Sequence, residues 1–338
     1  MVRVLAIILN WRSEKMTRCA MDAAMLALRD VDGALVVVDN DSGDGSFEAL
    51  SKYVAARGWA DSPRPTRVIQ AGRNGGFGAG NNAGIRALMP DGSAPDYYYI
   101  LNSDAFPEVD AIKTLRDHLE GHPKTGFAGS FIYGEDGAPH RTAFRFPTIA
   151  SEFEAQVRFG PVSGLLKNFI VAQPMLIETG PTDWIAGASI MLRAKAIEEI
   201  GLFDETFFLY FEETDLCRRA SLAGWQCDYV VESRVMHIGS VSTGMREWSR
   251  VPEFWLDSRL HYFVKNHGAA YAACATVALV AGGILWRARL LVQDKERGDP
   301  PKFLFDLVRH HLQKAMNSLF KSSKEALGID PTRAKSRE

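Results

Sequence analysis

The sequence predicts an α/β fold, in which helices flank a mixed central sheet, followed by a C-terminal helical extension. Continuous apolar runs at residues 2–9 and 34–38 are typical of strands buried on both faces, and a helical pattern lies between them at 14–29. Helical periodicity replaces this alternation in the last quarter of the chain. We therefore expect an α/β domain over 1–250 and a helical extension over 251–338.

The composition is that of an ordinary soluble globular protein. The 338 residues suffice for a large buried core, and the formal net charge of −2 gives no reason to expect nucleic-acid binding. The chain starts directly with a strand, without a basic leader or a cleavage site, so we predict a cytoplasmic protein. The cysteines lack metal-ligand spacing and are typical of reduced thiols; they are Cys19, Cys217, Cys227 and Cys274.

Further elements follow the first two strands in order. We expect a helix over 46–57, a strand over 67–70, a helix over 81–89 and an aromatic-rich strand over 97–101. Ligands of such open sheets bind beyond the carboxyl ends of the strands. The residues at those ends are the first site candidates, and they include Asn10, Trp11, Asp39 and Asp104.

A glycine-rich loop over 73–84 leads into the third of these helices. Glycines let the backbone approach a ligand closely, although a purely structural turn explains the same residues. The spacing Gly76-Phe77-Gly78 does not continue as a dinucleotide fingerprint, which argues against a dinucleotide-dependent oxidoreductase.

Asp104 stands just beyond the end of the 97–101 strand. This position suits a ligand of Mg²⁺ or Mn²⁺, because such ions typically take one or two carboxylates together with substrate phosphate oxygens. A helix cap or a turn acid is the alternative reading of this residue.

The second half of the domain has a less regular pattern. We expect strands and a turn over 125–145, an irregular segment over 146–180, and a loop that enters a buried strand over 183–193. A short helix over 194–200 and a strand over 227–231 complete the domain.

The acidic stretch Glu212-Glu213-Thr214-Asp215 lies between that helix and that strand. At helical spacing Glu212 and Asp215 share a face, while Glu213 points elsewhere. Acids are favoured at a helix N-terminus, so a charged helix start explains the stretch as well as a functional site does.

Three helical segments are expected in the extension, over 253–265, 268–286 and 302–326, with a break at Pro300-Pro301. The 268–286 segment has no charged residue, but it is rich in Ala and Gly rather than Leu and Ile. A membrane-spanning helix is one reading of it, and a buried or surface-lying helix is the other.

Five motifs, in this order over about residues 4–240, resemble the family-2 glycosyltransferases with the GT-A fold, and among them the rhamnosyltransferase-like branch. The motifs are Ile8-Leu9-Asn10-Trp11, Val38-Asp39-Asn40-Asp41-Ser42, Arg73-Asn74-Gly75-Gly76-Phe77 with Asn81-Asn82, Leu101-Asn102-Ser103-Asp104, and the block from Trp184 to Ala188 with Phe211 to Leu216. The resemblance implies a Rossmann-like mixed sheet with a donor half over about 1–105 and an acceptor half over 106–250.

The resemblance also implies an inverting, metal-dependent mechanism. A carboxylate base takes the proton of an acceptor hydroxyl as that hydroxyl attacks the anomeric carbon of a nucleotide-diphosphate sugar, and Mg²⁺ or Mn²⁺ neutralises the departing diphosphate. By position Glu213 matches the base, although Glu212 could exchange roles with it. Asp104 and His237 match metal ligands, but the family's Asp-any-Asp motif keeps only its final acid here, and a core histidine also explains His237.

Other site residues are carried over from the same motifs. Asp39 would accept a hydrogen bond from the ring N–H of the nucleotide base, and packing alone also explains Trp184. The expected donor-nucleotide pocket consists of Asn10, Trp11, Asp39, Arg73, Asn74, Gly76, Asn102 and Ser103. The expected wall between donor and acceptor consists of Trp184, Gly187, Ala188 and Glu212.

The implied function is transfer of a sugar to a glycan or polyprenyl-linked acceptor in bacterial surface polysaccharide synthesis. The branch suggests dTDP-L-rhamnose as the donor, with a UDP-sugar as the alternative. The 251–338 extension would lie on the inner face of the plasma membrane as a peripheral contact, or would mediate self-association into a homo-oligomer.

Two other functions stay open on the sequence. A transferase-like nucleotide-sugar-binding protein without catalysis would explain the missing first acid of the metal motif. A nucleotidyltransferase would also join a nucleotide site to a metal acid, but no basic glycine signature lies next to the first strand.

Overall fold

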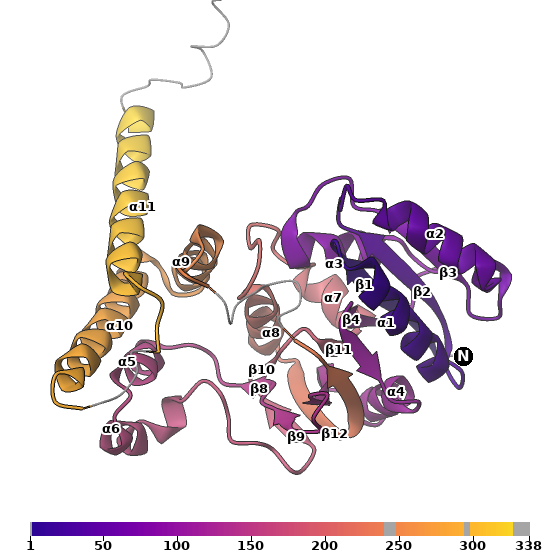
Figure 1. Ribbon diagram of the computed structural model, residues 1–338, viewed down its shortest axis with the longest axis horizontal. Coiled ribbons are helices and arrows are strands. Elements are labelled where there is room, and N and C mark those ends of the chain that lie inside the picture. Colours follow the sequence, from indigo (N-terminus) through magenta and orange to yellow (C-terminus); the bar gives the residue numbers. More distant parts are fainter. Residues whose placement is uncertain (1, 240–247, 294–297, 327–338) are drawn as a thin grey trace, which may run out of the picture.

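The computed structural model describes residues 2–239, 248–293 and 298–326, with side chains up to residue 317. A ten-stranded sheet forms the centre of the molecule, in the order β3-β2-β1-β4-β11-β6-β12-β5, with β7 beside β6 and β9 beside β12. Two helices of the C-terminal extension, α10 (Ala269–Leu290) and α11 (Phe303–Ala326), stand at one side of the molecule (Figure 1). The α/β fold with flanking helices and a helical extension is confirmed.

The first half of the sheet is parallel, as the alternating pattern predicts. β1 pairs with β2 and β4, and β2 pairs with β3. Asn10 is aligned with Asp39, and Leu9 with Asn102, so the predicted site residues at these strand ends meet at one edge. The elements are β1 (Arg3–Asn10), α1 (Glu14–Ala27), β2 (Asp32–Asp39), α2 (Ser46–Ala56), β3 (Thr66–Gln70), α3 (Gly76–Arg86) and β4 (Tyr97–Asn102).

The helix α3 begins five residues earlier than the predicted start at residue 81, so much of the predicted glycine-rich loop is helical. Because its glycines have no side chains, this helix can lie directly on β1. A Cβ atom on Gly80 would stand 2.3 Å from Leu9 Cδ1, and one on Gly84 would stand 2.5 Å from Ile7 Cγ2. Close packing, rather than loop flexibility, explains these two glycines.

The second half of the sheet is mixed, because β11 runs antiparallel between β4 and β6. The strand β12 runs parallel to β6 and extends six residues beyond the predicted end at residue 231, which brings His237 beside Ala105 in β5. The elements are β5 (Ala105–Pro107), α4 (Ala111–Gly121), β6 (Thr125–Tyr133), β7 (Pro139–His140), β8 (Ala143–Phe144), β9 (Gly180–Thr182), β10 (Trp184–Ile185), β11 (Ser189–Arg193), α7 (Ala194–Ile200), α8 (Glu212–Leu222) and β12 (Gln226–His237).

Two apolar cores lie on opposite faces of the sheet. The first contains side chains of α1, α2 and α4, and the second contains side chains of α3, α7 and α8. The strands between them are almost fully buried, which is why they read as continuous apolar runs in the sequence.

The prediction of an irregular segment over 146–180 is wrong. This segment contains two helices, α5 (Ile149–Val157) and α6 (Gly160–Leu165). Thr148 caps α5, because its side chain accepts from the Ser151 backbone N–H at 3.1 Å. The contact with α10 is close, since a Cβ atom on Gly282 would stand 2.6 Å from the Phe153 carbonyl oxygen. Packing against α10, a helix more than a hundred residues away in the chain, therefore contributes to the stability of α5.

The extension packs on the α/β part through buried polar contacts. Its first helix, α9 (Glu253–His267), carries the fully buried Arg259, which forms an ion pair with Glu152 of α5 and donates to Thr276 of α10 at 3.1 Å. By length and composition alone, α10 could cross a bilayer. One of its faces, however, packs against α5 and α9, and this favours the reading of a partly buried helix.

Candidate active site

A cavity of about 550 Å³ lies at the carboxyl ends of β1, β2 and β4. It is the place at which an open α/β sheet is expected to bind its ligand. The predicted site residues that line it are Trp11, Asn74, Gly76, Asn102, Ser103, Asp104, Ala188 and His237. Further lining residues include Leu9, Asn40, Phe77, His140, Arg141, Thr142, Ala186, Phe208, Leu209, Tyr210, Gly239 and Phe254.

Asp104 and His237 meet in this cavity although 133 residues separate them. The Nε2 atom of His237 lies 3.1 Å from Asp104 Oδ1, and 3.5 Å from the Asn102 side-chain nitrogen. Both side chains are largely buried, and both have a ligand atom next to the cavity. A carboxylate and an imidazole at one point of a nucleotide-sized cavity fit a Mn²⁺ or Mg²⁺ ion that completes its shell with phosphate oxygens and water.

Asp39 lies beneath the cavity rather than in its wall. Its Oδ1 atom accepts from the Asn10 side chain at 2.8 Å and from the Ser42 hydroxyl at 2.6 Å, and its Oδ2 atom accepts from the Ser42 backbone N–H at 3.2 Å. Both Asp39 and Asn10 are buried. In this arrangement the three residues fix the loop after β2, and Oδ2 keeps most of its acceptor capacity.

Asn40 lines the cavity, although its motif alone predicts no role for it. Its side chain donates to the Asn74 Oδ1 atom at 3.0 Å and to the Gly76 carbonyl at 3.2 Å. Asn74 Oδ1 also accepts from the Gly76 backbone N–H at 3.1 Å. These bonds tie the loop after β2 to the start of α3, so both line the cavity in a fixed geometry.

Arg73 and Trp184, two further predicted site residues, lie outside the cavity lining. The Arg73 guanidinium is exposed and forms an ion pair with Glu205 at 2.9 Å. Trp184 stacks on Phe144 with ring centroids 4.2 Å apart, and its Nε1 donates to the Arg145 carbonyl at 2.9 Å. The two-stranded sheet of β8 and β10 thus carries Trp184, shortly before the lining residues Ala186 and Ala188 in the chain.

The acidic stretch forms the first turn of α8, so the charged helix start and the candidate catalytic group are the same residues. Tyr210 and Phe211, just before it, both adopt the left-handed conformation at φ 70°, which is a strained state for aromatic side chains. Neither Glu212 nor Glu213 is among the described residues that line the cavity. Glu213 lies next to the backbone of Gly187, which stands between the lining residues Ala186 and Ala188.

Burial raises the pKa of Glu213, while its hydrogen bonds to backbone N–H groups, including that of Gly187, act in the opposite direction. Burial raises the pKa of Glu212 still further, and the adjacent charge of Glu213 adds to the effect. One carboxyl oxygen of each residue is enclosed without a hydrogen-bond partner among the described residues. A carboxylate with a raised pKa is suited to proton transfer near neutral pH.

Asp215 anchors the acidic helix to the extension. Its buried carboxylate pairs with Arg219 at 2.9 Å and with Lys265 of α9 at 2.7 Å, and accepts from the Asn266 side chain at 3.1 Å. The arginine that pairs with this carboxylate is Arg219 and not its neighbour Arg218, which lies over the Phe146 ring.

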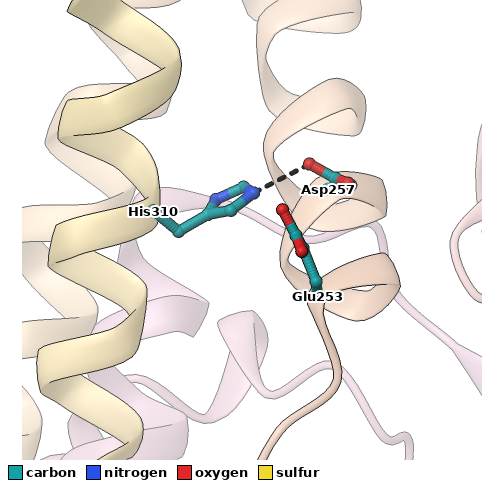
Figure 2. A group of neighbouring side chains, drawn as sticks. All are labelled: Glu253, Asp257 and His310. Carbon is teal, nitrogen blue, oxygen red and sulfur yellow. Dashed lines mark hydrogen bonds and ion pairs between the residues drawn. The ribbon is translucent and has the colours of Figure 1, made fainter.

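A second group of side chains could hold a cation. Figure 2 shows Glu253 and Asp257 on α9 facing His310 on α11, and their ligand atoms lie within 4.8 Å of one another. None of the three lines the cavity. His310 and Lys314 each lie 2.7 Å from the Asp257 Oδ1 atom, so the described residues already provide a cationic partner for this carboxylate.

Comparison with known proteins relates part of this chain to a family. Residues 26–180 match the family described as Glycosyl transferase family 2. The matched segment, a little under half of the chain, is similar to a family-2 glycosyltransferase domain.

The domain resembles curated rhamnosyltransferases. It is 26% identical over 227 residues to an N-acetylglucosaminyl-diphospho-decaprenol L-rhamnosyltransferase of Mycobacterium tuberculosis, covering 62% of this chain and 68% of the relative. It is 27% identical over 166 residues to rhamnosyltransferase WbbL of Escherichia coli, covering 48% of this chain and 60% of the relative.

Solved structures support the fold. A crystal structure of GalNAc-T7 with UDP, GalNAc and Mn²⁺ superposes with a TM-score of 0.54 at 14% identity, over 92% of this chain and 54% of that one. At this identity the likeness concerns the GT-A fold of the glycosyltransferase domain, and the predicted fold class is confirmed.

Proposed function

We propose that the protein is an inverting glycosyltransferase that moves a sugar, L-rhamnose, from dTDP-L-rhamnose to a glycan carried on a polyprenyl diphosphate. The observation that carries the proposal is the pair of Asp104 and His237 in a cavity at the carboxyl ends of the parallel strands. The curated relatives favour this sugar, and the acceptor named for the mycobacterial relative carries a diphospho-polyprenol.

The donor nucleotide would lie along the first half of the sheet. Trp11 offers an aromatic face to the base, while Asn74 and Gly76 border the cavity where the ribose or a phosphate would lie. Asp39 remains the proposed acceptor for the ring N–H of the base, and its buried side chain would have to become accessible from the cavity. Arg73 would approach the donor only if it left Glu205.

Asp104 and His237 would hold a divalent cation, which when bound supplies positive charge for the departing diphosphate. Mn²⁺ suits the imidazole ligand better than Mg²⁺, which prefers oxygen ligands. Asn102 and Ser103 occupy the first two positions of the family's metal motif, and both line the cavity without carrying charge.

Glu213 is the proposed base. Its carboxylate would take the proton of the acceptor hydroxyl as that oxygen bonds to the anomeric carbon and the carbon–phosphate oxygen bond breaks. To do so it must come within about 3 Å of the acceptor oxygen, past the Gly187 backbone. The strained Tyr210 and Phe211 just before the helix are where such an adjustment would take place.

The proposal is tested by incubating the protein with dTDP-L-rhamnose, UDP-sugars and GDP-mannose in the presence of Mn²⁺ or Mg²⁺, and by following nucleotide release. We expect release from one nucleotide sugar, stimulated by a lipid-linked acceptor and abolished by chelation. The Asp104→Asn variant should lose metal-dependent nucleotide binding, whereas Asp257→Asn, in the group between α9 and α11, should keep it.

Two results would contradict the proposal. Absence of binding to every nucleotide diphosphate would remove the donor site, and tight binding without any transfer would favour the non-catalytic binding protein instead. Loss of the metal response in Asp257→Asn, rather than in Asp104→Asn, would move the metal site to the α9–α11 group.

A further inference from the structure

We propose that Arg141 is the phosphate-binding cation of the cavity, a role that the sequence motifs did not assign; the inference rests on the proposed function. Among the described lining residues, Asp104 carries the one negative charge and Arg141 the one fixed positive charge. A fixed cation in this position favours an anionic ligand, and both the donor and the acceptor of the proposed reaction carry phosphate.

The Arg141 side chain is exposed at the cavity and forms no hydrogen bond or ion pair with the residues that the structure describes. Two other arginines of the same half of the domain differ from it in this respect. Arg145 donates to the Ile170 carbonyl at 3.0 Å, and Arg193 donates to the Thr125 carbonyl at 3.0 Å. Those two side chains support the fold, whereas Arg141 faces a cavity.

The backbone on both sides of Arg141 is fixed. His140 pairs with Ile132 across the β6–β7 ladder, and the Thr142 carbonyl accepts from the Ala186 backbone N–H at 3.0 Å. Ala186 itself lines the cavity. A side chain between two such anchors loses little backbone entropy on binding a ligand, which is the arrangement expected of a binding residue.

The chemistry of the side chain favours phosphate. A planar guanidinium presents paired N–H donors that match two oxygens of a phosphate group, and it stays charged at every physiological pH. Asp104 with its cation would neutralise one part of a diphosphate, and Arg141 would bind oxygens that the cation does not reach.

Two diphosphates could supply these oxygens. One is the diphosphate of the donor nucleotide, and the other joins the acceptor glycan to its polyprenol. Arg141 lies between β7 and β8, in the expected acceptor half of the domain. It lines the same cavity as Asp104, so either diphosphate could reach it.

The test is isothermal titration of the wild-type protein and three variants with dTDP, UDP and farnesyl diphosphate in the presence of Mn²⁺. Arg141→Ala should weaken binding of the nucleotide or of the prenyl diphosphate roughly 10- to 100-fold, the effect of losing a charged hydrogen-bond partner. Arg141→Lys should recover part of this loss, because it keeps the charge but not the paired donors. Arg29→Ala, which removes an exposed arginine at the end of α1, is the matched control and should bind like wild type.

A loss confined to dTDP and UDP would assign Arg141 to the donor diphosphate, and a loss confined to farnesyl diphosphate would assign it to the acceptor. Unchanged affinity of Arg141→Ala for all three probes, at an unchanged Tm, would overturn the inference, as would failure of the wild type to bind any diphosphate. The proposed function fails separately: a protein that binds diphosphate through Arg141 yet releases no nucleotide from any sugar donor would retain this site without being a transferase.

Discussion

Glu213 illustrates how a single residue can be both structural and chemical. As a first-turn acid it is stabilised by the helix dipole of α8, and as a largely enclosed carboxylate beside Glu212 it holds its proton more tightly than an exposed acid. A base with these properties ionises closer to neutral pH, where the acceptor hydroxyl must give up its proton.

We expect Glu213→Gln to keep nucleotide-diphosphate binding but to lower kcat by roughly 10²- to 10⁴-fold, the usual contribution of a general base. The substitution preserves the size and the first helical turn, so folding should be intact. Binding is measured by calorimetry and turnover by nucleotide release. If Glu213→Gln retains most of its turnover, Glu213 is not the base.

Glu212→Gln tests the other candidate base: it should keep its turnover if Glu213 is the base. It also has a stability signature of its own. The folded-state pKa of Glu212 lies well above its ordinary value of 4.5, so unfolding above pH 4.5 releases a proton and wild-type stability falls as pH rises toward the folded-state pKa. Glutamine has no such proton. The stability of the variant relative to wild type should therefore increase with pH, by up to ~1.4 kcal/mol per pH unit, in denaturant titrations between pH 5 and 8. A pH-independent difference would mean that Glu212 ionises normally.

At the scale of elements, the start of α3 is joined to the lead-in of α8. Gly76 has a left-handed φ of 84°, and the Phe77 backbone N–H donates across it to the Phe208 carbonyl at 3.0 Å. A Cβ atom on Gly76 would stand 1.7 Å from that same carbonyl oxygen. Only glycine allows the two cavity-lining segments to approach this closely.

Gly76→Ala should therefore destabilise the fold by roughly 2–4 kcal/mol, through a strained φ together with displacement of the Phe208 backbone. Nucleotide binding should weaken as well, since both segments line the cavity. Gly92→Ala isolates the effect of the strained φ, because Gly92 has a similar φ of 80° and no described atom lies near its Cβ position. Equal losses of Tm and equal binding in the two variants would show that the contact with Phe208 is unimportant.

At the scale of the whole molecule, the extension presents a basic and apolar surface. Phe305, Arg309, Leu312 and Met316 are exposed and share one face of α11, with the exposed Lys302 just before the helix. The only acid of this helix up to residue 317, Asp306, is buried against Arg250. Exposed apolar residues also lie on α10 and directly after it; they are Val277, Ile284 and Leu285 on the helix and Leu291 and Val292 beyond its end.

We propose that this surface binds an anionic lipid bilayer, because its fixed charges are positive and lie among apolar side chains. The triple variant Phe305→Ser, Arg309→Ser, Leu312→Ser should lose at least ~10-fold in affinity for phosphatidylglycerol vesicles in sedimentation assays, and wild-type binding should weaken with salt. Leu26→Ser, at an exposed site on α1, is the control. Equal binding to neutral phosphatidylcholine vesicles would contradict the proposed contribution of the positive charges to membrane binding. Loss of a dimer in the triple variant without vesicles would assign the surface to self-association.

Local patterns were sufficient to predict much of the fold. The strands that end at Asn10, Asp39 and Asn102 are continuous apolar runs, which are stable only when both faces of the strand are buried. Their existence and their common edge therefore follow from chain order and the rules of parallel sheets. The α7 helix was predicted with its observed bounds, because Gly201 ends it with a φ of 81°. By contrast, α5 was missed, since much of its stabilisation comes from Gly282 of α10 rather than from its own periodicity.

The sequence by itself determined the α/β architecture, the strand-end residues and, through a resemblance, the family. Only the tertiary structure decided which side chains share a cavity. Asp104 and His237 come together through the pairing of β5 with β12, and Arg141 reaches the cavity through contacts on both sides of it. The same structure pairs Arg219 with Asp215, and the predicted site residue Arg73 with Glu205. Strand and helix preferences act between near neighbours in the chain, whereas charge pairing and cavity formation depend on distances that the packed sheet sets between remote residues.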